Sequence, residues 1–164
     1  MKFVKKSMES IKKFLDEVPD ISLGYSEIIF LRSNELEDGQ IGYRVDDKGN
    51  SLITGQDGDW QENWIVIASD FAGDPIFVDI ASPNLTVLCA AHGEMAWDPM
   101  IIADSLDKLK EIISILINVS KHRTSPVDLE ANPTREDERE SVLKSIQNLI
   151  PGSDIEYWQI FLAD

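Results

Sequence analysis

Cysteine is almost absent from this chain of 164 residues, in which Cys89 is the only one. It lies in the apolar run from 86 to 91, where a thiol packs as a small hydrophobic side chain. An intrachain disulfide is therefore excluded, and an oxidising compartment is not required. A chain of about this length buries roughly 68–70% of its surface on folding. We expect it to fold without a disulfide or a metal.

Long apolar runs are also missing. No stretch approaches the roughly 18 apolar residues that a membrane-spanning helix needs. The chain starts with basic residues, but no continuous apolar segment follows them, so the start does not match a secretion signal. These features predict a cytoplasmic protein that does not bind a membrane.

Basic residues are scarce, with 15 of them against 30 acidic residues and a formal net charge of −15. This balance argues against nucleic acid as a direct partner and against an anionic membrane surface, because both are bound by Lys and Arg clusters. It favours attraction of a basic protein partner. Solubility alone is the alternative explanation.

The usual signatures of catalysis and metal binding are absent too. The chain has no Gly-x-Ser-x-Gly elbow and no phosphate-binding Gly-x-x-x-x-Gly-Lys loop. Two histidines and one cysteine make a zinc site improbable, and the loop 70–74 lacks the ligand series of a calcium site. We predict no enzyme, catalytic residue, metal or cofactor. The alternative is a ligand-binding or catalytic pocket near His92, Glu94 and Asp98.

Hydrophobic periodicity predicts an N-terminal helix, then strands, then helices. The helix spans 3–17, where apolar residues recur every three or four positions. A helix capped by Asp104 or Ser105 runs to about 120, and others span 135–150 and 154–162, with an extended link over 121–133. Strands are predicted at 27–32, 41–45, 51–54, 64–68, 76–80 and 86–90.

This order of elements predicts one α+β domain over residues 1–164. Consecutive strands followed by consecutive helices favour α+β over the alternating pattern of a parallel sheet. Short links between strands favour antiparallel hairpins. We expect a mainly antiparallel sheet of about six strands, with a mixed sheet as the alternative, packed by N- and C-terminal helices.

The centre of the chain carries a series of motifs. Residues 60–79 have the form Trp, hydrophobic strand, Asp-x-x-Gly-Asp-Pro, strand, Asp. His92-Gly93-Glu94 follows with Trp97 nearby, and the segment 102–106 then opens a helix. In order and spacing these motifs resemble the SUKH superfamily, which includes bacterial immunity proteins and relatives of a fungal cell-wall-synthesis regulator. The resemblance covers about residues 1–120, so 121–164 would be a C-terminal helical extension.

The resemblance implies a SUKH-like fold and a non-enzymatic function. It implies an immunity protein that binds and neutralises a cognate protein toxin, frequently a nuclease. The alternative within the same superfamily is a regulatory or scaffold module, whose C-terminal helices would recruit a resident protein.

Acidic residues cluster where the partner would bind. Between Glu35 and Glu62 there are eight acidic and two basic residues, and between Trp64 and Met100 five acidic and none basic. The predicted partner contacts are five carboxylates on turns and loops and two aromatic anchors: Asp46, Asp47, Asp57, Asp59, Glu62, Trp60 and Trp97. The alternatives are a solvated surface and rings buried against the sheet. Exposed strand edges could pair between copies, although the sequence does not predict an oligomer.

Overall fold

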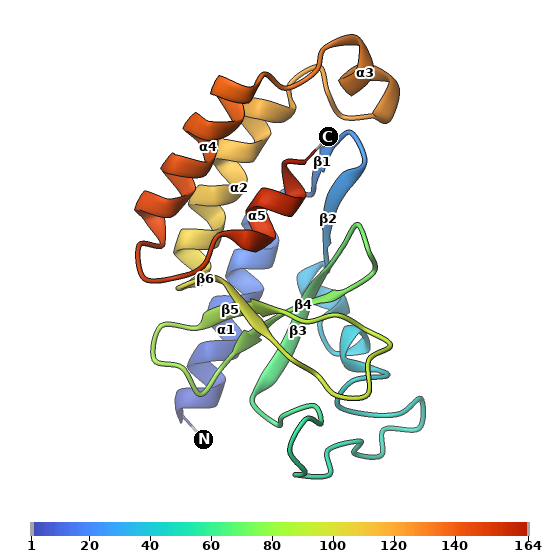
Figure 1. Cartoon of the computed structure of the whole chain (residues 1–164). Coiled ribbons are helices and arrows are strands. Elements are labelled where there is room, and N and C mark those ends of the chain that lie inside the picture. The colour runs from blue at the N-terminus through green and yellow to red at the C-terminus, as the bar shows by residue number, and fades with distance from the viewer. Residues whose placement is uncertain (1, 164) are drawn as a thin grey trace.

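A computed structural model of the chain describes residues 2–163. Figure 1 shows helix α1, a sheet, and then four helices. The helices are α1 (Lys2–Glu17), α2 (Leu106–Ser120), α3 (Pro126–Ala131), α4 (Glu136–Leu149) and α5 (Glu156–Phe161). The strands are β1 (Ile21–Leu23), β2 (Ser26–Phe30), β3 (Trp64–Asp70), β4 (Pro75–Asp79), β5 (Thr86–Cys89) and β6 (Met100–Ala103). Two short 3-10 turns, η1 (Ser33–Glu35) and η2 (Asp38–Gln40), follow β2.

The six strands form one sheet in the order β1 to β6, and every neighbouring pair is antiparallel. The prediction of an α+β domain with an antiparallel sheet and terminal helices is therefore confirmed. The reason is local: the links between successive strands are mostly short, and a short link can only reverse the chain. The longest link, from 31 to 63, forms the two turns and a large loop.

Both faces of the central strands are buried, but in different cores. Ile65, Ile67 and Ile76 point into the main core, which contains residues from α1, α2, α4 and α5. Val66 and Phe77 point to the opposite face, into a second core with Trp60 and Ala90. No residue of α1 to α5 belongs to that second core in the described chain. The loop 41–63 covers this face in place of a helix.

The helices follow their sequence signals closely. Ile11 and Leu15 on the predicted stripe of α1 are buried. Ser105 caps α2, since its hydroxyl accepts a hydrogen bond from the Lys108 amide at 3.2 Å. The apolar face of α2 is buried as predicted, with Leu109, Ile112 and Leu116 among its members.

The strands predicted at 41–45 and 51–54 are wrong, because this segment forms only isolated bridges at Ile41, Val45 and Ser51. The cause lies at Gln40, whose buried side chain takes the place of a strand neighbour. Its amide nitrogen donates to the Val66 carbonyl at 2.9 Å, and its amide oxygen accepts from the Val66 N–H at 2.9 Å. One side chain thus satisfies backbone groups that a paired strand would otherwise bond.

Three elements were not predicted: β1, β6 and α3. Residues 102 and 103, expected at the opening of a helix, belong instead to β6. The link 121–133, expected to be extended, contains α3. Ser125 caps α3 and Pro126 occupies its first position, which is a standard helix-start signal that was missed.

Candidate functional site: the acidic loop lobe

The helix-free face of the sheet is covered by two loops, 41–63 and 90–99, which we call the acidic lobe. Trp60 lies at its centre and is 3% exposed. Its ring centroid is 4.7 Å from that of Phe77, 4.9 Å from that of Tyr43 and 5.1 Å from that of Trp97. The Trp60 Nε1–H donates to the Trp64 carbonyl at 3.2 Å. The prediction that Trp60 contacts a partner is therefore corrected: its ring forms the interior that holds the lobe on the sheet.

Trp97 is half-buried and joins the two loops. Its backbone N–H donates to the Gly58 carbonyl at 2.7 Å. Gly58 has a φ of +86°, and a Cβ at this position would lie 2.8 Å from the Cβ of Ala96. The two loops therefore touch at a point that only glycine fits, because other residues would both strain the backbone and clash. The hydrogen bond and this close contact join the end of the 90–99 loop to the 41–63 loop.

The five predicted carboxylates divide into two groups. Asp46 accepts hydrogen bonds from the Lys48 and Asn50 backbone amides and from the Asn50 side chain, and these bonds lower its pKa. Asp59 accepts a hydrogen bond from the Thr54 hydroxyl. Both therefore shape the loop that carries them.

Asp47, Asp57 and Glu62 form the second group. Their side chains are exposed and make no hydrogen bond or ion pair to any residue between 2 and 163. A carboxylate with no internal partner is free to meet a cation from outside. These three are the carboxylates available to a partner.

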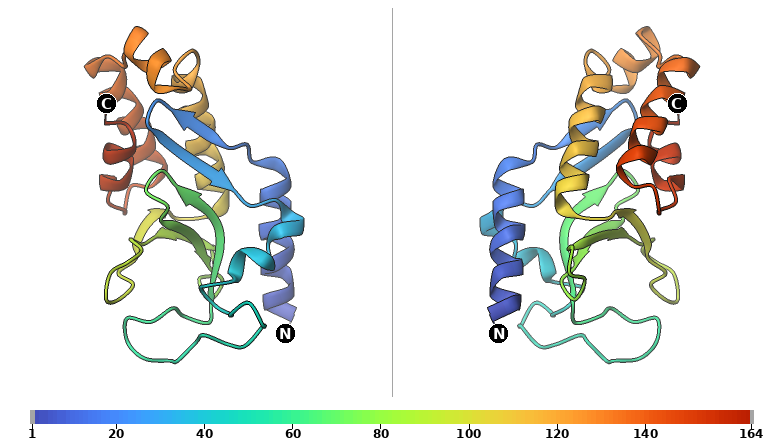
Figure 2. Two further views of the ribbon diagram at one scale, coloured as in Figure 1. Left: turned by 90° about the vertical axis from the view of Figure 1, so that its right-hand side faces the viewer. Right: turned by 90° about the vertical axis from the view of Figure 1, so that its left-hand side faces the viewer.

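Charge is distributed unevenly along the chain. Residues 35–100 contain thirteen acidic and two basic side chains, whereas residues 1–34 contain five acidic and six basic ones. Residues 101–164 contain twelve acidic and seven basic side chains. Figure 2 shows the loop 41–63 at the end of the molecule opposite α3. Most of the net charge is therefore carried by the sheet and its loops, away from the tip of the helical layer.

His92 and Asp74 pin the 90–99 loop to the β3–β4 turn. The Asp74 Oδ1 accepts the His92 backbone N–H at 2.8 Å and lies 2.6 Å from the His92 Nδ1. Glu94 and Asp98, the other members of the suggested pocket, are exposed. His92 therefore has a structural partner in Asp74.

Asp70 and Gly73 shape the β3–β4 turn. Gly73 has a φ of +80°, and the Asp70 Oδ1 accepts the backbone N–H groups of Ala72 and Asp74 at 2.9 and 3.0 Å. The other Asp70 oxygen accepts the Tyr157 hydroxyl at 3.2 Å and lies 3.8 Å from the Cys89 sulfur. Asp70 therefore links the turn to helix α5.

Loss of contact with water is the main cause of the raised pKa values of Asp70, Cys89 and Tyr157. Asp70 is 7% exposed, and the loss of water raises the pKa of its carboxyl. Burial and the neighbouring Asp70 also raise the pKa of the Cys89 thiol and of the Tyr157 hydroxyl. A thiol held protonated is a poor nucleophile, so the network joins elements and does not activate Cys89. Cys89 packs as a small buried side chain, as predicted.

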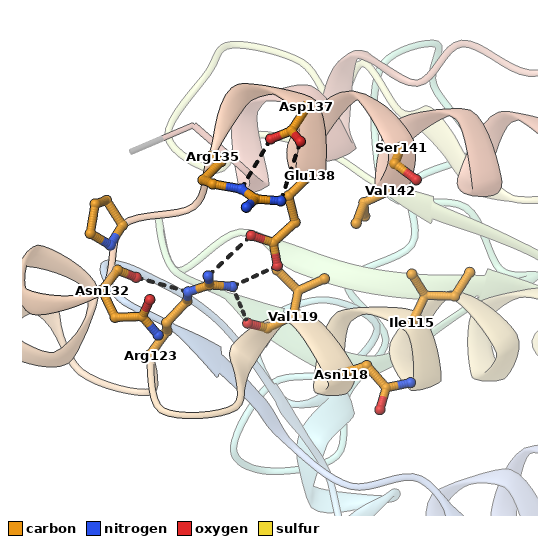
Figure 3. Close-up of a pocket in the computed structure, with 11 residues that line it drawn as sticks. Ile115, Asn118, Val119, Arg123, Asn132, Arg135, Asp137, Glu138, Ser141 and Val142 are labelled. Carbon is orange, nitrogen blue, oxygen red and sulfur yellow. Dashed lines mark hydrogen bonds and ion pairs between the residues drawn. The ribbon is translucent and has the colours of Figure 1, made fainter.

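A groove of about 760 Å³ lies between α2 and α4, at the opposite side of the main core (Figure 3). Arg123 closes one end, where its guanidinium donates to both Glu138 oxygens at 2.8 and 3.0 Å. Its remaining bonds go to the carbonyls of Val119 and Asn132. Both charges are satisfied within the protein. This groove was not predictable from the sequence, because Arg123 and Glu138 lie on separate elements.

Two features are absent from residues 2–163. No helix there is long and apolar enough to cross a membrane. No three His, Cys, Asp or Glu side chains in that range are grouped so that they could hold a metal ion.

A comparison with known proteins found no matching family model, no similar curated protein and no similar solved structure. The resemblance to the SUKH superfamily therefore stays a prediction that depends on the motifs alone.

Proposed function

We propose that the chain is an immunity protein that binds and neutralises a cationic protein toxin through the acidic lobe. The observation that carries the proposal is the concentration of thirteen carboxylates against two basic side chains in residues 35–100. The motif series that resembles the SUKH superfamily supports it. The partner is a protein, not nucleic acid or a membrane, and the role implies a cytoplasmic location.

The charge of the lobe suits a toxin that grips phosphates, such as a nuclease. Such an enzyme exposes Lys and Arg in its substrate groove. Asp47, Asp57 and Glu62 would meet those side chains, and their long-range attraction would mainly raise the association rate. Occupying the groove would exclude the nucleic acid.

Apolar contacts on the lobe would then set the lifetime of the complex. Met95 is fully exposed at the tip of the 90–99 loop, and Ile41 and Leu52 on the other loop are also exposed. Since Trp60 is buried, these side chains take the anchoring role that the sequence suggested for the tryptophans. Methionine suits such a position because its flexible thioether adapts to the partner.

Co-expression with the toxin domain encoded by the adjacent gene tests the proposal. We expect the chain to restore growth and to co-purify with the toxin. The double variant Asp47→Lys, Asp57→Lys should slow association by about tenfold or more at low salt, and this effect should shrink as salt is raised. Surface plasmon resonance measures both quantities.

The matched control is Glu9→Lys, Glu140→Lys, which changes the net charge equally at exposed positions of α1 and α4. It should slow association far less. Unchanged killing together with no complex would count against toxin binding altogether. Equal effects of the two double variants would show that net charge acts and that the lobe is not the contact surface.

The groove between α2 and α4 favours the second candidate function, a regulatory or scaffold module. Ile115 and Val142 line it, and Asn118 and Ser141 are the polar groups at its side (Figure 3). In that case Ser141→Trp would fill the groove and abolish binding of a resident enzyme recovered from the host. The variant with Asp47→Lys and Asp57→Lys would still bind that enzyme.

A further inference from the structure

Arg44 is one of only two basic residues among residues 35–100, and Lys48 is the other. Its guanidinium forms no ion pair with any residue in the described range, although carboxylates surround it in the sequence. One nitrogen, Nη2, donates to the backbone carbonyl of Glu62 at 2.8 Å. The Nε–H is buried and has no acceptor. Buried donors without a partner are rare in folded proteins, so this guanidinium calls for an explanation.

Two hollows of about 350 Å³ each lie against Arg44, and Glu62 lines both of them. The first is otherwise lined by Val45, Ser51 and Ile53. The second is mainly apolar and lies between the start of α1 and the end of β4; its other lining residues are Val4, Asn63, Ile80 and Ala81. A volume of this size is at the lower end of what small-molecule sites occupy.

The second hollow therefore combines three kinds of group. Arg44 offers a guanidinium that no carboxylate in the described range neutralises, and a guanidinium forms strong hydrogen bonds with carboxylates. Glu62 offers an exposed carboxylate that has no ion pair. Val4, Ile80 and Ala81 offer aliphatic surface. The two charges are opposite, yet no ion pair joins them in the structure.

Net charge narrows the ligand class. A purely anionic ligand would be repelled by the thirteen carboxylates of residues 35–100, and a purely cationic one would leave Arg44 unsatisfied. A zwitterion has no net charge, and it can pair its carboxylate with Arg44 and its ammonium group with Glu62. The aliphatic surface then selects a ligand with an apolar side chain.

We propose that this hollow binds a free aliphatic α-amino acid. Its carboxylate contacts Arg44, its ammonium group contacts Glu62, and its side chain lies against Val4 and Ile80. The inference does not rest on toxin binding: Arg44, Val4 and Ile80 have no part in the proposed toxin contact, and only Glu62 is common to both.

Titration of the full chain with L-leucine, followed by the backbone amide signals in NMR spectra, tests the proposal. We expect saturable shifts at Arg44, Ile80 and Ala81. Three further probes each remove one contact: N-acetyl-leucine lacks the ammonium group, leucinamide lacks the carboxylate, and glycine lacks the side chain. Each should bind about tenfold more weakly, or worse, because a charged contact or the buried apolar surface is lost.

Two variants and a control complete the experiment. Arg44→Gln and Glu62→Gln should each weaken leucine binding by about tenfold or more, whereas Lys48→Gln should leave it unchanged. Glu62 is exposed, so Glu62→Gln keeps the test valid if Arg44→Gln impairs folding. Shifts that never saturate, binding of N-acetyl-leucine as tight as that of leucine, or unchanged binding in Glu62→Gln would each overturn the proposal.

Discussion

Gly58 joins the two loops of the acidic lobe, and its substitution should loosen them. A left-handed backbone costs a non-glycine residue about 1–2 kcal/mol. The Cβ of Gly58→Ala would also lie 2.8 Å from that of Ala96, which adds an overpacking cost of about 1–3 kcal/mol. We expect the free energy of unfolding, measured with urea, to fall by the sum of both costs.

Gly49→Ala is the matched control, because Gly49 has a φ of +83° with nothing within 4 Å of the added Cβ. It should lose only about 1–2 kcal/mol. Equal losses in the two variants would mean that the contact between the loops contributes nothing.

Asp70 should make the protein less stable as pH rises. Its folded-state pKa is raised by burial, so the unfolded chain releases the proton at a lower pH than the folded one. Between the ordinary carboxyl value of about 4 and the raised folded value, the folded state binds more protons, and its stability falls with rising pH. Asp70→Asn removes the titrating carboxyl and with it this dependence of stability on pH. The unfolding free energy of Asp70→Asn relative to wild type should therefore increase from pH 4 upward.

Asp46→Asn should show the opposite dependence. The hydrogen bonds from Asn50 lower the folded-state pKa of Asp46, so its contribution is present above the ordinary carboxyl value and is lost as pH falls through the folded value. The loss caused by Asp46→Asn should shrink on acidification. Urea unfolding of both variants at several pH values measures the two slopes, and slopes of equal sign would contradict the assignment of at least one group.

At the scale of elements, Arg123 and Glu138 link α4 to the segment that follows α2. The Arg123 side chain is 11% exposed, so Glu138→Gln leaves its charge buried without a counter-ion. We expect a loss of about 1–3 kcal/mol in the free energy of unfolding. Asp137→Asn is the control, because it breaks the ion pair between Asp137 and Arg135, in which both side chains are 75% exposed. It should lower the free energy of unfolding by at most about 1 kcal/mol. Similar losses of unfolding free energy in Glu138→Gln and Asp137→Asn would show that water already solvates the Arg123–Glu138 pair.

The elements differ in how far local sequence predicted them. Helix α2 and strands β3 to β5 follow their hydrophobic patterns, since each buries a face that the pattern defines. The segment 41–45 alternates like a strand, yet it cannot pair with β3 because Gln40 already bonds Val66. Strand β1 has only three residues, too few for a pattern to emerge, and the last residues of β6 were assigned to the helix that follows it.

At the scale of the whole molecule, the charge of −15 should destabilise the folded state through self-repulsion. Raising the salt concentration screens this repulsion, so the melting temperature should rise by about 2–4 °C for each kcal/mol that is screened. The rise should be smaller in the variant with Asp47→Lys and Asp57→Lys. Differential scanning calorimetry at low and moderate salt measures both, and a salt-independent melting temperature would contradict the prediction.

The candidate site was predictable only in part, because some of its features are local in the sequence and others depend on contacts between distant residues. The sequence alone located the acidic stretches and the exposed carboxylates Asp47, Asp57 and Glu62, because charge and turn residues are local properties. It could not tell whether Trp60 and Trp97 face a partner or the sheet. The sequence also did not predict the hollow beside Arg44, because this hollow forms only when Val4 and Ile80, far apart in the chain, lie side by side.

By itself, the sequence determined the α+β class, the mainly antiparallel pairing of strands, the amphipathic helices and the concentration of negative charge in one part of the chain. These follow from spacing and composition. Only the tertiary structure decided that Trp60 is buried, that Gln40 replaces a strand and that Tyr157 bonds Asp70 across 87 positions. Such contacts join residues far apart in the chain, and they form only when packing against the two faces of the sheet brings those residues together.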